Sequence, residues 1–242
     1  LINVINSLTK TEHRILYYGP LTLNEATAAL QKNHFSGTLV KPATPINLTE
    51  QKTGNQVYVV DYDMKQAEIM MLGKGEPFSD THIASIKMYN EYFGGNMSSI
   101  LFQELRESKA LAYSVGGSYK VPNAKNKSFY VNTYIGSQAD KLGEALQGMN
   151  DLIKDLPKAD VMFESAKESV ISGIRNERLT KMDLLISYEN ARRLGLNYDV
   201  RKTIFEKAQT MTFADVQKFQ QTYVKNVPLS LLIVGKKELL AA

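Results

Sequence analysis

The sequence predicts an α+β fold, in which one antiparallel or mixed sheet carries helices packed on one face. Three observations indicate this class. Short β-favouring runs bounded by turn residues lie between residues 56 and 136, and segments with helical spacing dominate residues 138–224. One more apolar run of strand character follows at residues 229–235. We expect Ile, Leu, Val and Phe side chains to fill the layer between sheet and helices.

The composition is that of a globular protein with an ordinary core. Of the 242 residues, 43% are hydrophobic, which suffices for one large domain or two small ones. Lys and Arg total 29 and Asp and Glu 25, so the formal net charge is only +4, and the basic residues are scattered. Because phosphate recognition works through clustered positive charge, we expect no nucleic-acid partner.

The N-terminal region is predicted to contain an extension and a linker. Residues 14–19 have the character of a strand that ends at a glycine, and residues 23–32 that of a helix. Residues 36–55 hold two prolines and two glycines among polar side chains, which is typical of a linker. We therefore predict that residues 1–35 are the tail of a preceding similar domain or an N-terminal extension, and that residues 56–242 form one domain.

The first seven residues lack an initiator Met, a basic region and a long apolar run. We therefore expect neither a signal peptide nor a membrane anchor there, and no membrane span in the chain. The missing initiator Met also indicates a fragment of a longer protein, so any targeting segment would lie elsewhere.

Four strands are predicted in the first half of the main domain. Residues 56–62 and 67–73 are separated by only four residues, so they predict a hairpin or two neighbouring strands. Residues 112–120 and 128–136 are the next two strands, joined by a turn that contains Pro and Asn. The fifth strand, at residues 229–235, ends in a glycine, as the predicted N-terminal strand does, which suggests a duplicated architecture.

Helices are predicted where apolar side chains recur at a spacing of three or four residues. Residues 79–93 have this pattern and stop at a double glycine, and a short helix follows at residues 98–107. Thr212, with Asp215 three residues on, is the expected N-cap of the last helix. The C-terminal helices are expected at residues 138–156, 160–180, 181–196 and 212–224.

The chain lacks the side-chain patterns of a self-contained enzyme. Metal-dependent hydrolysis needs two or three converging ligands, often two His four residues apart, but His13, His34 and His82 have no His partner at that spacing. The absence of cysteine excludes disulfides, thiol catalysis and zinc sites built on thiolates. No phosphate loop or Gly-x-Ser-x-Gly motif is present. We therefore expect no catalytic residue, metal site or cofactor in this chain.

One segment resembles a known family. Residues 92–115, YFGGNMSSILFQELRESKALAYSV, resemble the segment of pitrilysin-type (insulinase-like, mitochondrial-processing-peptidase-like) zinc metallopeptidases in which a helix ends at a double glycine, a Ser-rich turn opens a short helix ending in Leu-Arg-Glu, and a strand follows. Residues 66–73 resemble the family's preceding strand, and residues 17–19 the end of a neighbouring domain. The resemblance is specific from about residue 56 to residue 136.

The resemblance implies a fold and a function. Family members build a clamshell from repeated α+β domains of the LuxS/processing-peptidase-like fold, and only the first domain carries the zinc motif His-x-x-Glu-His, which this chain lacks. It therefore implies a C-terminal, zinc-free domain that encloses a peptide substrate and is inactive alone. The zinc would lie in a catalytic domain of the same chain or of a partner subunit. The bacterial periplasm or cell envelope is the implied location; a non-enzymatic scaffold subunit or a peptide-binding module is the alternative.

The resemblance also implies two substrate-binding residues. Active family members offer an Arg and a Tyr, seven positions apart, to the substrate near the zinc, and Arg106 and Tyr113 have that spacing, 113 − 106 = 7. Both are hydrogen-bond donors, and donors fixed beside a carbonyl oxygen stabilise the negative charge that develops during amide hydrolysis. The structural alternative is that Arg106 pairs with Glu104, Glu107 or a helix C-terminus while Tyr113 is a half-buried strand residue.

A second, weaker candidate is the tyrosine-rich strand at residues 128–136. Tyr130 and Tyr134 alternate with apolar residues, so they are expected on one face of the sheet. Together with small residues of the preceding strand they would form a surface for an extended peptide. Plain packing within the sheet is the alternative.

Overall fold

The computed structural model describes residues 1–240 apart from residues 9, 34–37, 45 and 47. The expectations for His34 and for the start of the predicted linker therefore lie outside the described residues. The chain divides into two compact units. One comprises Leu1–Thr49 and Leu179–Glu189, and the other Glu50–Arg178 and Asn190–Ala242.

The smaller unit contains helices α1 (Ile2–Leu8) and α2 (Leu23–Asn33). The strand predicted at residues 14–19 is not formed, and this prediction was wrong. A strand needs a neighbour that accepts and donates its backbone hydrogen bonds, and no described segment pairs with these residues. The duplication hypothesis relied on a strand, a glycine and a helix near each end of the chain. The N-terminal strand of that pair is not formed.

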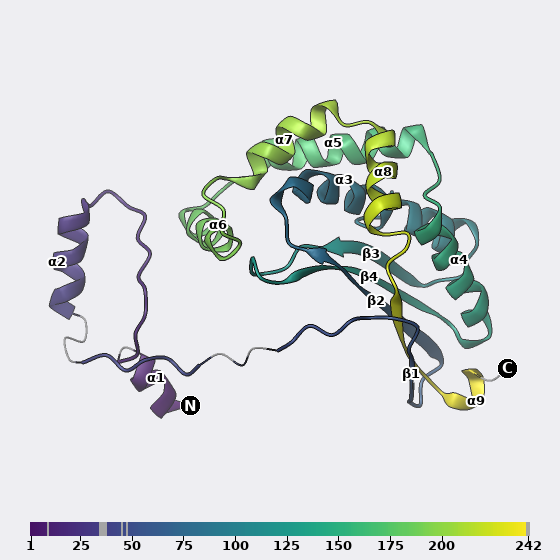
Figure 1. Ribbon diagram of the computed structural model, residues 1–242, viewed down its shortest axis with the longest axis horizontal. Helices are drawn as coiled ribbons and strands as arrows, with labels where there is room; N and C mark the ends of the chain where they lie inside the picture. Colours follow the sequence, from purple (N-terminus) through teal and green to yellow (C-terminus); the bar gives the residue numbers. More distant parts are fainter. Residues whose placement is uncertain (9, 34–37, 45, 47, 241–242) are drawn as a thin grey trace. The chain divides into compact units, whose positions relative to one another are not determined.

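The larger unit is built on a mixed sheet, whose five described strands have the order β1-β5-β2-β4-β3 (Figure 1). Strand β1 runs parallel to β5, and the other neighbouring strands are antiparallel. The bounds are β1 Val57–Asp61, β2 Gln66–Pro77, β3 Ser114–Lys120, β4 Ser128–Gln138 and β5 Leu229–Gly235.

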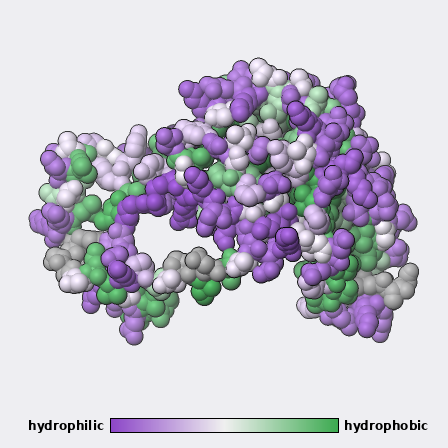
Figure 2. Space-filling view, viewed as in Figure 1, coloured by the Kyte–Doolittle hydropathy of each residue, from purple (hydrophilic) through white to green (hydrophobic). Residues whose placement is uncertain are grey.

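Strands β1 and β2 are not neighbours, so the hairpin predicted for them was wrong. Strand β5 lies between them and pairs with both. The more apolar strand takes the central position: Ile233 of β5 is buried in the core, whereas all five side chains of β1 are exposed. Figure 2 shows hydrophobic side chains at the surface around β1, which forms one edge of the sheet.

Most helices of the larger unit cover one face of the sheet (Figure 1). Their apolar side chains form one core with the sheet residues that face them, such as Ile69, Val131 and Ile135. Tyr92 meets Phe163 and Phe213 edge to face, so aromatic rings supply much of this layer. The predicted α+β class is confirmed. The helices in the described part of this unit include α3 Ile83–Phe93, α4 Leu142–Lys154, α5 Asp160–Asn176, α7 Val200–Thr210, α8 Phe213–Tyr223 and α9 Lys237–Leu240.

Most predicted helices are present with slightly shorter bounds, and the expected capping box of α8 is formed: Thr212 and Asp215 each accept a backbone N–H of the other. Helix α6 (Lys181–Arg193) contributes its first residues to the smaller unit. Helix α7 was not predicted. Only Ile204 and Ala208 of α7 are buried, so its apolar stripe is too short to stand out in the sequence.

Candidate functional site

The double glycine after α3 sets how closely that helix approaches the sheet. Gly94 ends the helix, and its N–H donates to Asn90 O over 3.1 Å, as the stop signal predicted. A Cβ atom placed on Gly94 would lie 2.5 Å from Gly117 N and 2.6 Å from Gly117 O. Only a residue without a side chain allows the end of α3 to lie directly against β3.

The chain then forms a π-helix, η2 (Phe102–Ser108), where a short helix was predicted. Its last turn closes with a bond from Lys109 N–H to Glu104 O, five residues back. Leu105 is fully buried, and its carbonyl accepts from Leu111 N–H over 2.8 Å and Ala112 N–H over 3.2 Å. These bonds return the chain from the helix to the sheet, so the elements carrying Arg106 and Tyr113 lie next to each other. Single π-helical turns frequently occur at functional sites.

The turn between helix and strand has an unusual backbone. Ala110 has a φ of +48°, in the left-handed region that non-glycine residues rarely adopt. The Lys141 ammonium donates to the Ala110 carbonyl over 3.1 Å, which ties this turn to η3 (Ala139–Lys141). A charged donor is a strong partner for a carbonyl, so Lys141 helps to hold the strained turn.

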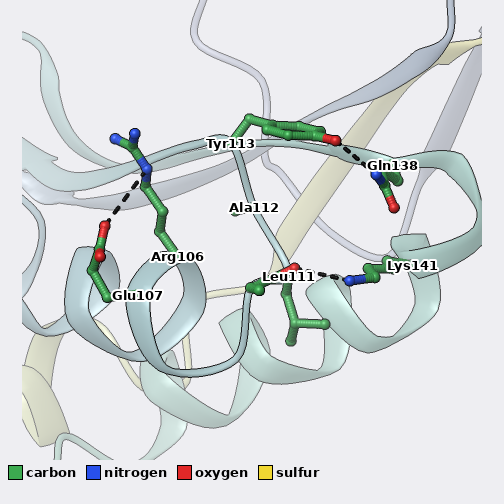
Figure 3. A pocket seen from close by; sticks show the side chains of 8 residues that line it. Arg106, Glu107, Leu111, Ala112, Tyr113, Gln138 and Lys141 are labelled. Carbon is green, nitrogen blue, oxygen red and sulfur yellow. Dashed lines mark hydrogen bonds and ion pairs between the residues drawn. The ribbon is translucent and has the colours of Figure 1, made fainter.

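Tyr113 is fixed at both its backbone and its hydroxyl group. Its N–H donates over 2.8 Å to the O atom of Gly136, the β4 residue that also pairs with Ser114. The Gln138 side chain donates from Nε2 to Tyr113 Oη over 2.6 Å, as Figure 3 shows. The Tyr113 side chain remains 50% exposed, so one part of the ring is open to a ligand.

Arg106 and Tyr113 line one pocket of about 340 Å³ (Figure 3). The sequence-predicted pair is therefore brought to the same place by two consecutive elements. In Figure 3 the Tyr113 ring extends toward Gln138, and the Arg106 guanidinium rises beside Glu107. The lining residues are Arg106, Glu107, Ala110, Leu111, Ala112, Tyr113, Gln138 and Lys141.

The Arg106 guanidinium keeps most of its hydrogen-bonding capacity. Its carbon lies 4.6 Å from the centre of the Phe102 ring, and its Nε is 3.8 Å from the Glu107 carboxylate, too far for a hydrogen bond. Both side chains of this ion pair are about half exposed, and such pairs contribute about 0–1 kcal/mol. Among the described residues, none is seen to accept a hydrogen bond from its Nη atoms. The pairing with Glu107 that the structural alternative predicted is present but weak.

Tyr130 and Tyr134 lie elsewhere, on the sheet face opposite the helices, and neither lines this pocket. The Tyr134 hydroxyl donates to Glu68 Oε2 over 2.9 Å and accepts from Ser114 Oγ over 3.4 Å. The bond from Ser114 lowers the pKa of Tyr134, but burial and the Glu68 carboxylate together raise it above the usual value. Burial, followed by the nearby Glu50 carboxylate, also raises the pKa of Tyr130.

Gln138 and Lys141 were missed by the sequence reasoning. The strand register alone would not have found Gln138: Ser114 pairs with Gly136, so an antiparallel ladder continued by two residues places residue 138 opposite residue 112 rather than Tyr113. Lys141 carries no sequence signal either, because its contact depends on how the chain turns into η3.

A metal site does not form in the described part of the chain. These residues contain no group of three His, Cys, Asp or Glu side chains that could hold an ion, so they do not fit zinc. The His82 ring packs 4.5 Å from the Tyr223 ring, and burial together with the Lys207 charge lowers its pKa. His13 Nδ1 lies within hydrogen-bond distance of Thr11 O, at 2.6 Å. None of the described helices is both long enough and apolar enough to cross a membrane.

Comparison with known families decides the relationship. Residues 14–169 match the family described as the peptidase M16 inactive domain, which is more than half of the chain. The chain belongs to this family. The resemblance to a non-catalytic domain of pitrilysin-type zinc metallopeptidases is thereby confirmed.

Relatives of this M16 inactive domain include bacterial zinc proteases. The uncharacterized zinc protease YmxG of Bacillus subtilis is 29% identical over 111 residues, which cover 45% of this chain and 26% of that protein. The chain thus matches about a quarter of the length of that relative.

Solved structures share the fold of this M16 inactive domain. The peptidase M16 inactive domain from Pseudomonas fluorescens is 16% identical with a TM-score of 0.67, over 90% of this chain and 52% of that one. The periplasmic protease PqqL from Escherichia coli is 13% identical with a TM-score of 0.66, over 90% of this chain and 25% of that one.

Proposed function

We propose that the chain is the zinc-free, substrate-enclosing domain of a zinc metalloendopeptidase that hydrolyses peptides, and that Arg106 and Tyr113 bind the substrate beside the reacting carbonyl. The zinc belongs to a catalytic M16 domain, in the same chain or in a partner subunit. One observation carries this proposal: the two predicted side chains line the same pocket, and the Arg106 guanidinium is only weakly paired.

The names of the relatives support peptide hydrolysis by the whole protein. The Bacillus relative is named a zinc protease, and PqqL is described as a periplasmic protease. The matched parts cover only 26% and 25% of those chains, so the activity belongs to the whole protein rather than to this domain alone. A bacterial envelope location is part of the proposal and is supported by PqqL.

The chemistry that these side chains offer is donation to an oxygen atom. Arg106 brings a permanent positive charge with several N–H donors, and Tyr113 brings one O–H donor. During amide hydrolysis the carbonyl oxygen becomes negative, so both bonds strengthen as the transition state forms. Removing one such preorganised donor from a hydrolase costs roughly 2.7–4 kcal/mol when the oxyanion is the partner, and less when the partner is another substrate carbonyl.

We further propose that Tyr130 and Tyr134 contact an extended part of the peptide. Strand β3 is the other edge of the sheet, so it has one side without a described partner strand. Ser114, the first residue of β3 after Tyr113, lies on the same sheet face as Tyr134 and donates to its hydroxyl. A peptide that passes the pocket can therefore continue along these side chains.

The test is peptide hydrolysis by the whole protein with its zinc-containing domain or subunit. We expect Arg106→Ala and Tyr113→Phe each to lower kcat/KM at least about tenfold, which corresponds to roughly 1.4 kcal/mol. Two matched controls should leave kcat/KM unchanged. Arg175→Ala removes an exposed Arg whose guanidinium carbon lies 5.8 Å from the Phe205 ring centre, and Tyr58→Phe removes an exposed hydroxyl that donates to Gln56.

Three results would contradict the proposal in different ways. Unchanged kinetics in folded Arg106 and Tyr113 variants would mean that both residues have structural roles and do not bind the substrate. Equal losses in the control variants would mean that the effect is not specific to the pocket. A whole protein without peptidase activity, measured with zinc, would favour the scaffold subunit instead.

A further inference from the structure

We propose that Gln138 is a positioning residue for Tyr113, which holds the phenol so that its proton points into the pocket. The proposal rests on the substrate-binding role proposed for Tyr113. Gln138 itself touches neither the substrate nor the reacting atoms. It acts through a single hydrogen bond, from Gln138 Nε2 to Tyr113 Oη over 2.6 Å.

The end of β4 holds Tyr113 from two sides. Gly136 O accepts the Tyr113 N–H over 2.8 Å, and Gln138, two residues on, reaches the hydroxyl of the same tyrosine. Ser137 between them is fully buried, and its hydroxyl donates to Leu111 O over 2.5 Å. Because these three consecutive residues bind the segment around Tyr113, the backbone that carries Gln138 is held close to the tyrosine.

The direction of the hydrogen bond decides what Tyr113 can do. A phenol has one proton to donate and two lone pairs that accept. When the Gln138 amide donates to the oxygen, the phenol proton stays available for a substrate carbonyl, and no described residue is seen to accept it. A hydroxyl that already accepts a hydrogen bond is also a stronger donor, since the two bonds polarise each other.

The bond also limits the motion of an exposed side chain. Half of the Tyr113 side chain is exposed, so packing alone leaves its ring free to move. A donor fixed before the substrate arrives costs less ordering entropy in the transition state than one that must be ordered then. Removing Gln138 is therefore expected to lower kcat more than it raises KM.

The other cation of the pocket does not take this role. The Lys141 ammonium donates to Ala110 O over 3.1 Å, at the left-handed turn, and no bond from it to Tyr113 is present. Gln138 is therefore the side chain in the described pocket that contacts the Tyr113 hydroxyl.

The experiment compares Gln138→Met and Gln138→Glu in the whole protein with its zinc-containing domain or subunit, alone and combined with Tyr113→Phe. Met keeps the length and removes the donor, and we expect kcat to fall about three- to tenfold with little change in KM. Glu is an acceptor at neutral pH and accepts the hydrogen bond from the Tyr113 O–H, so we expect a larger loss of kcat. In the Tyr113→Phe background both substitutions should have no further effect.

Matched controls and thermal unfolding separate this effect from a general loss of structure. Gln209→Met and Gln209→Glu change an exposed glutamine of α7 that donates to Phe205 O over 3.2 Å, and they should leave the kinetics unchanged. Each variant should unfold at the temperature of the wild-type protein, because Gln138 is exposed.

The results that overturn the positioning role are distinct from those that overturn the proposed function. If Tyr113→Phe is impaired while Gln138→Met is not, or if Gln138→Glu is as active as wild type, the positioning role is wrong. The same holds if Gln138→Met loses as much activity with Phe at position 113 as with Tyr. If Tyr113→Phe itself is fully active, the role proposed for Tyr113 fails, and that of Gln138 fails with it.

Discussion

Gly94 has no room for a side chain, because the end of α3 lies directly against the backbone of β3. The atoms that a Cβ would meet, Gly117 N and O, belong to a paired strand and cannot turn aside as a side chain would. We expect Gly94→Ala to lower the free energy of unfolding by about 1–3 kcal/mol. Because β3 follows Tyr113 directly, the substitution should also reduce peptide hydrolysis.

Urea unfolding of the protein checks this prediction, and Gly143→Ala is the matched control. Gly143 lies in α4, and nothing stands within 4 Å of a Cβ placed there. Gly143 is the second residue of α4, where alanine fits the helix at least as well, so this control should leave the free energy of unfolding unchanged or raise it slightly. If both variants behave alike, the close approach of α3 and β3 does not limit residue 94.

At this scale the sequence predicted two candidate side chains, whose role stays a prediction, but not the contacts that hold them. Arg106 and Tyr113 were recognised from their spacing in a family segment, and the structure places both at one pocket. The partners of Tyr113 could not be predicted in the same way. Gln138 and Gly136 come from another strand, and such contacts depend on the register of the sheet, which local sequence does not specify.

Among the elements, α8 has a complete local start signal. Thr212 Oγ1 accepts from Asp215 N–H, and the Asp215 carboxylate accepts from Thr212 N–H over 2.8 Å. We expect Thr212→Ala to lower the free energy of unfolding by about 0.5–2 kcal/mol. Thr222→Ala is the control. The Thr222 hydroxyl donates to Lys218 O within the same helix, so the substitution should be neutral or slightly stabilising.

The effect of Thr212→Ala should depend on pH. Hydrogen bonds from the side chain and then the backbone of Thr212 hold the pKa of Asp215 below its usual value. A depressed carboxyl pKa stabilises the folded state above the unfolded pKa of about 3.9, and this stabilisation is lost as the pH falls through the folded pKa. The difference between wild type and Thr212→Ala should therefore be full at pH 7 and shrink below about pH 4. Equal differences at pH 7 and pH 3 would contradict the carboxylate's part in the cap.

Elements with a complete local signal were predicted, whereas strand pairing, which depends on distant partners, was not. Helix α8 has its cap, and β4 has its alternation of buried and partly buried side chains. Residues 14–19 have strand composition but no described partner. Strand β5, more than 150 residues away in sequence, inserts between β1 and β2. The sequences of β1 and β2 do not predict this insertion.

For the whole molecule, we propose that residues 1–35 belong to a preceding similar domain or extension and that residues 36–55 link it to the domain at residues 56–242. The end of this linker is anchored to the larger unit. Ser128 N–H donates to the Glu50 carboxylate over 3.1 Å, and Thr53 Oγ1 donates to Pro228 O over 2.8 Å. Residues before Glu50 belong to the other compact unit.

Limited proteolysis with thermolysin, which cleaves before large apolar residues, tests this arrangement. We expect cleavage before Leu48 to precede cleavage before Val57, because Leu48 is exposed whereas Val57 pairs with Leu231 of β5. The fragment that starts at residue 48 should remain folded by circular dichroism. If this fragment unfolds or is degraded as fast as it forms, the larger unit depends on the N-terminal residues, and the proposed boundaries are wrong.

The π-helix η2 makes the orientation of Arg106 depend on the length of the chain. A π-helical turn holds one residue more than an α-helical turn, and one residue of an α-helix rotates the side chains by about 100°. Deleting a single residue between Arg106 and Leu111, or inserting one, would leave a plausible helix yet swing the guanidinium to another side of it. A change of length in this segment is therefore more harmful than most changes of its composition. The seven-residue spacing from Arg106 to Tyr113 fixes the direction in which the Arg106 side chain leaves the helix as well as its distance from Tyr113.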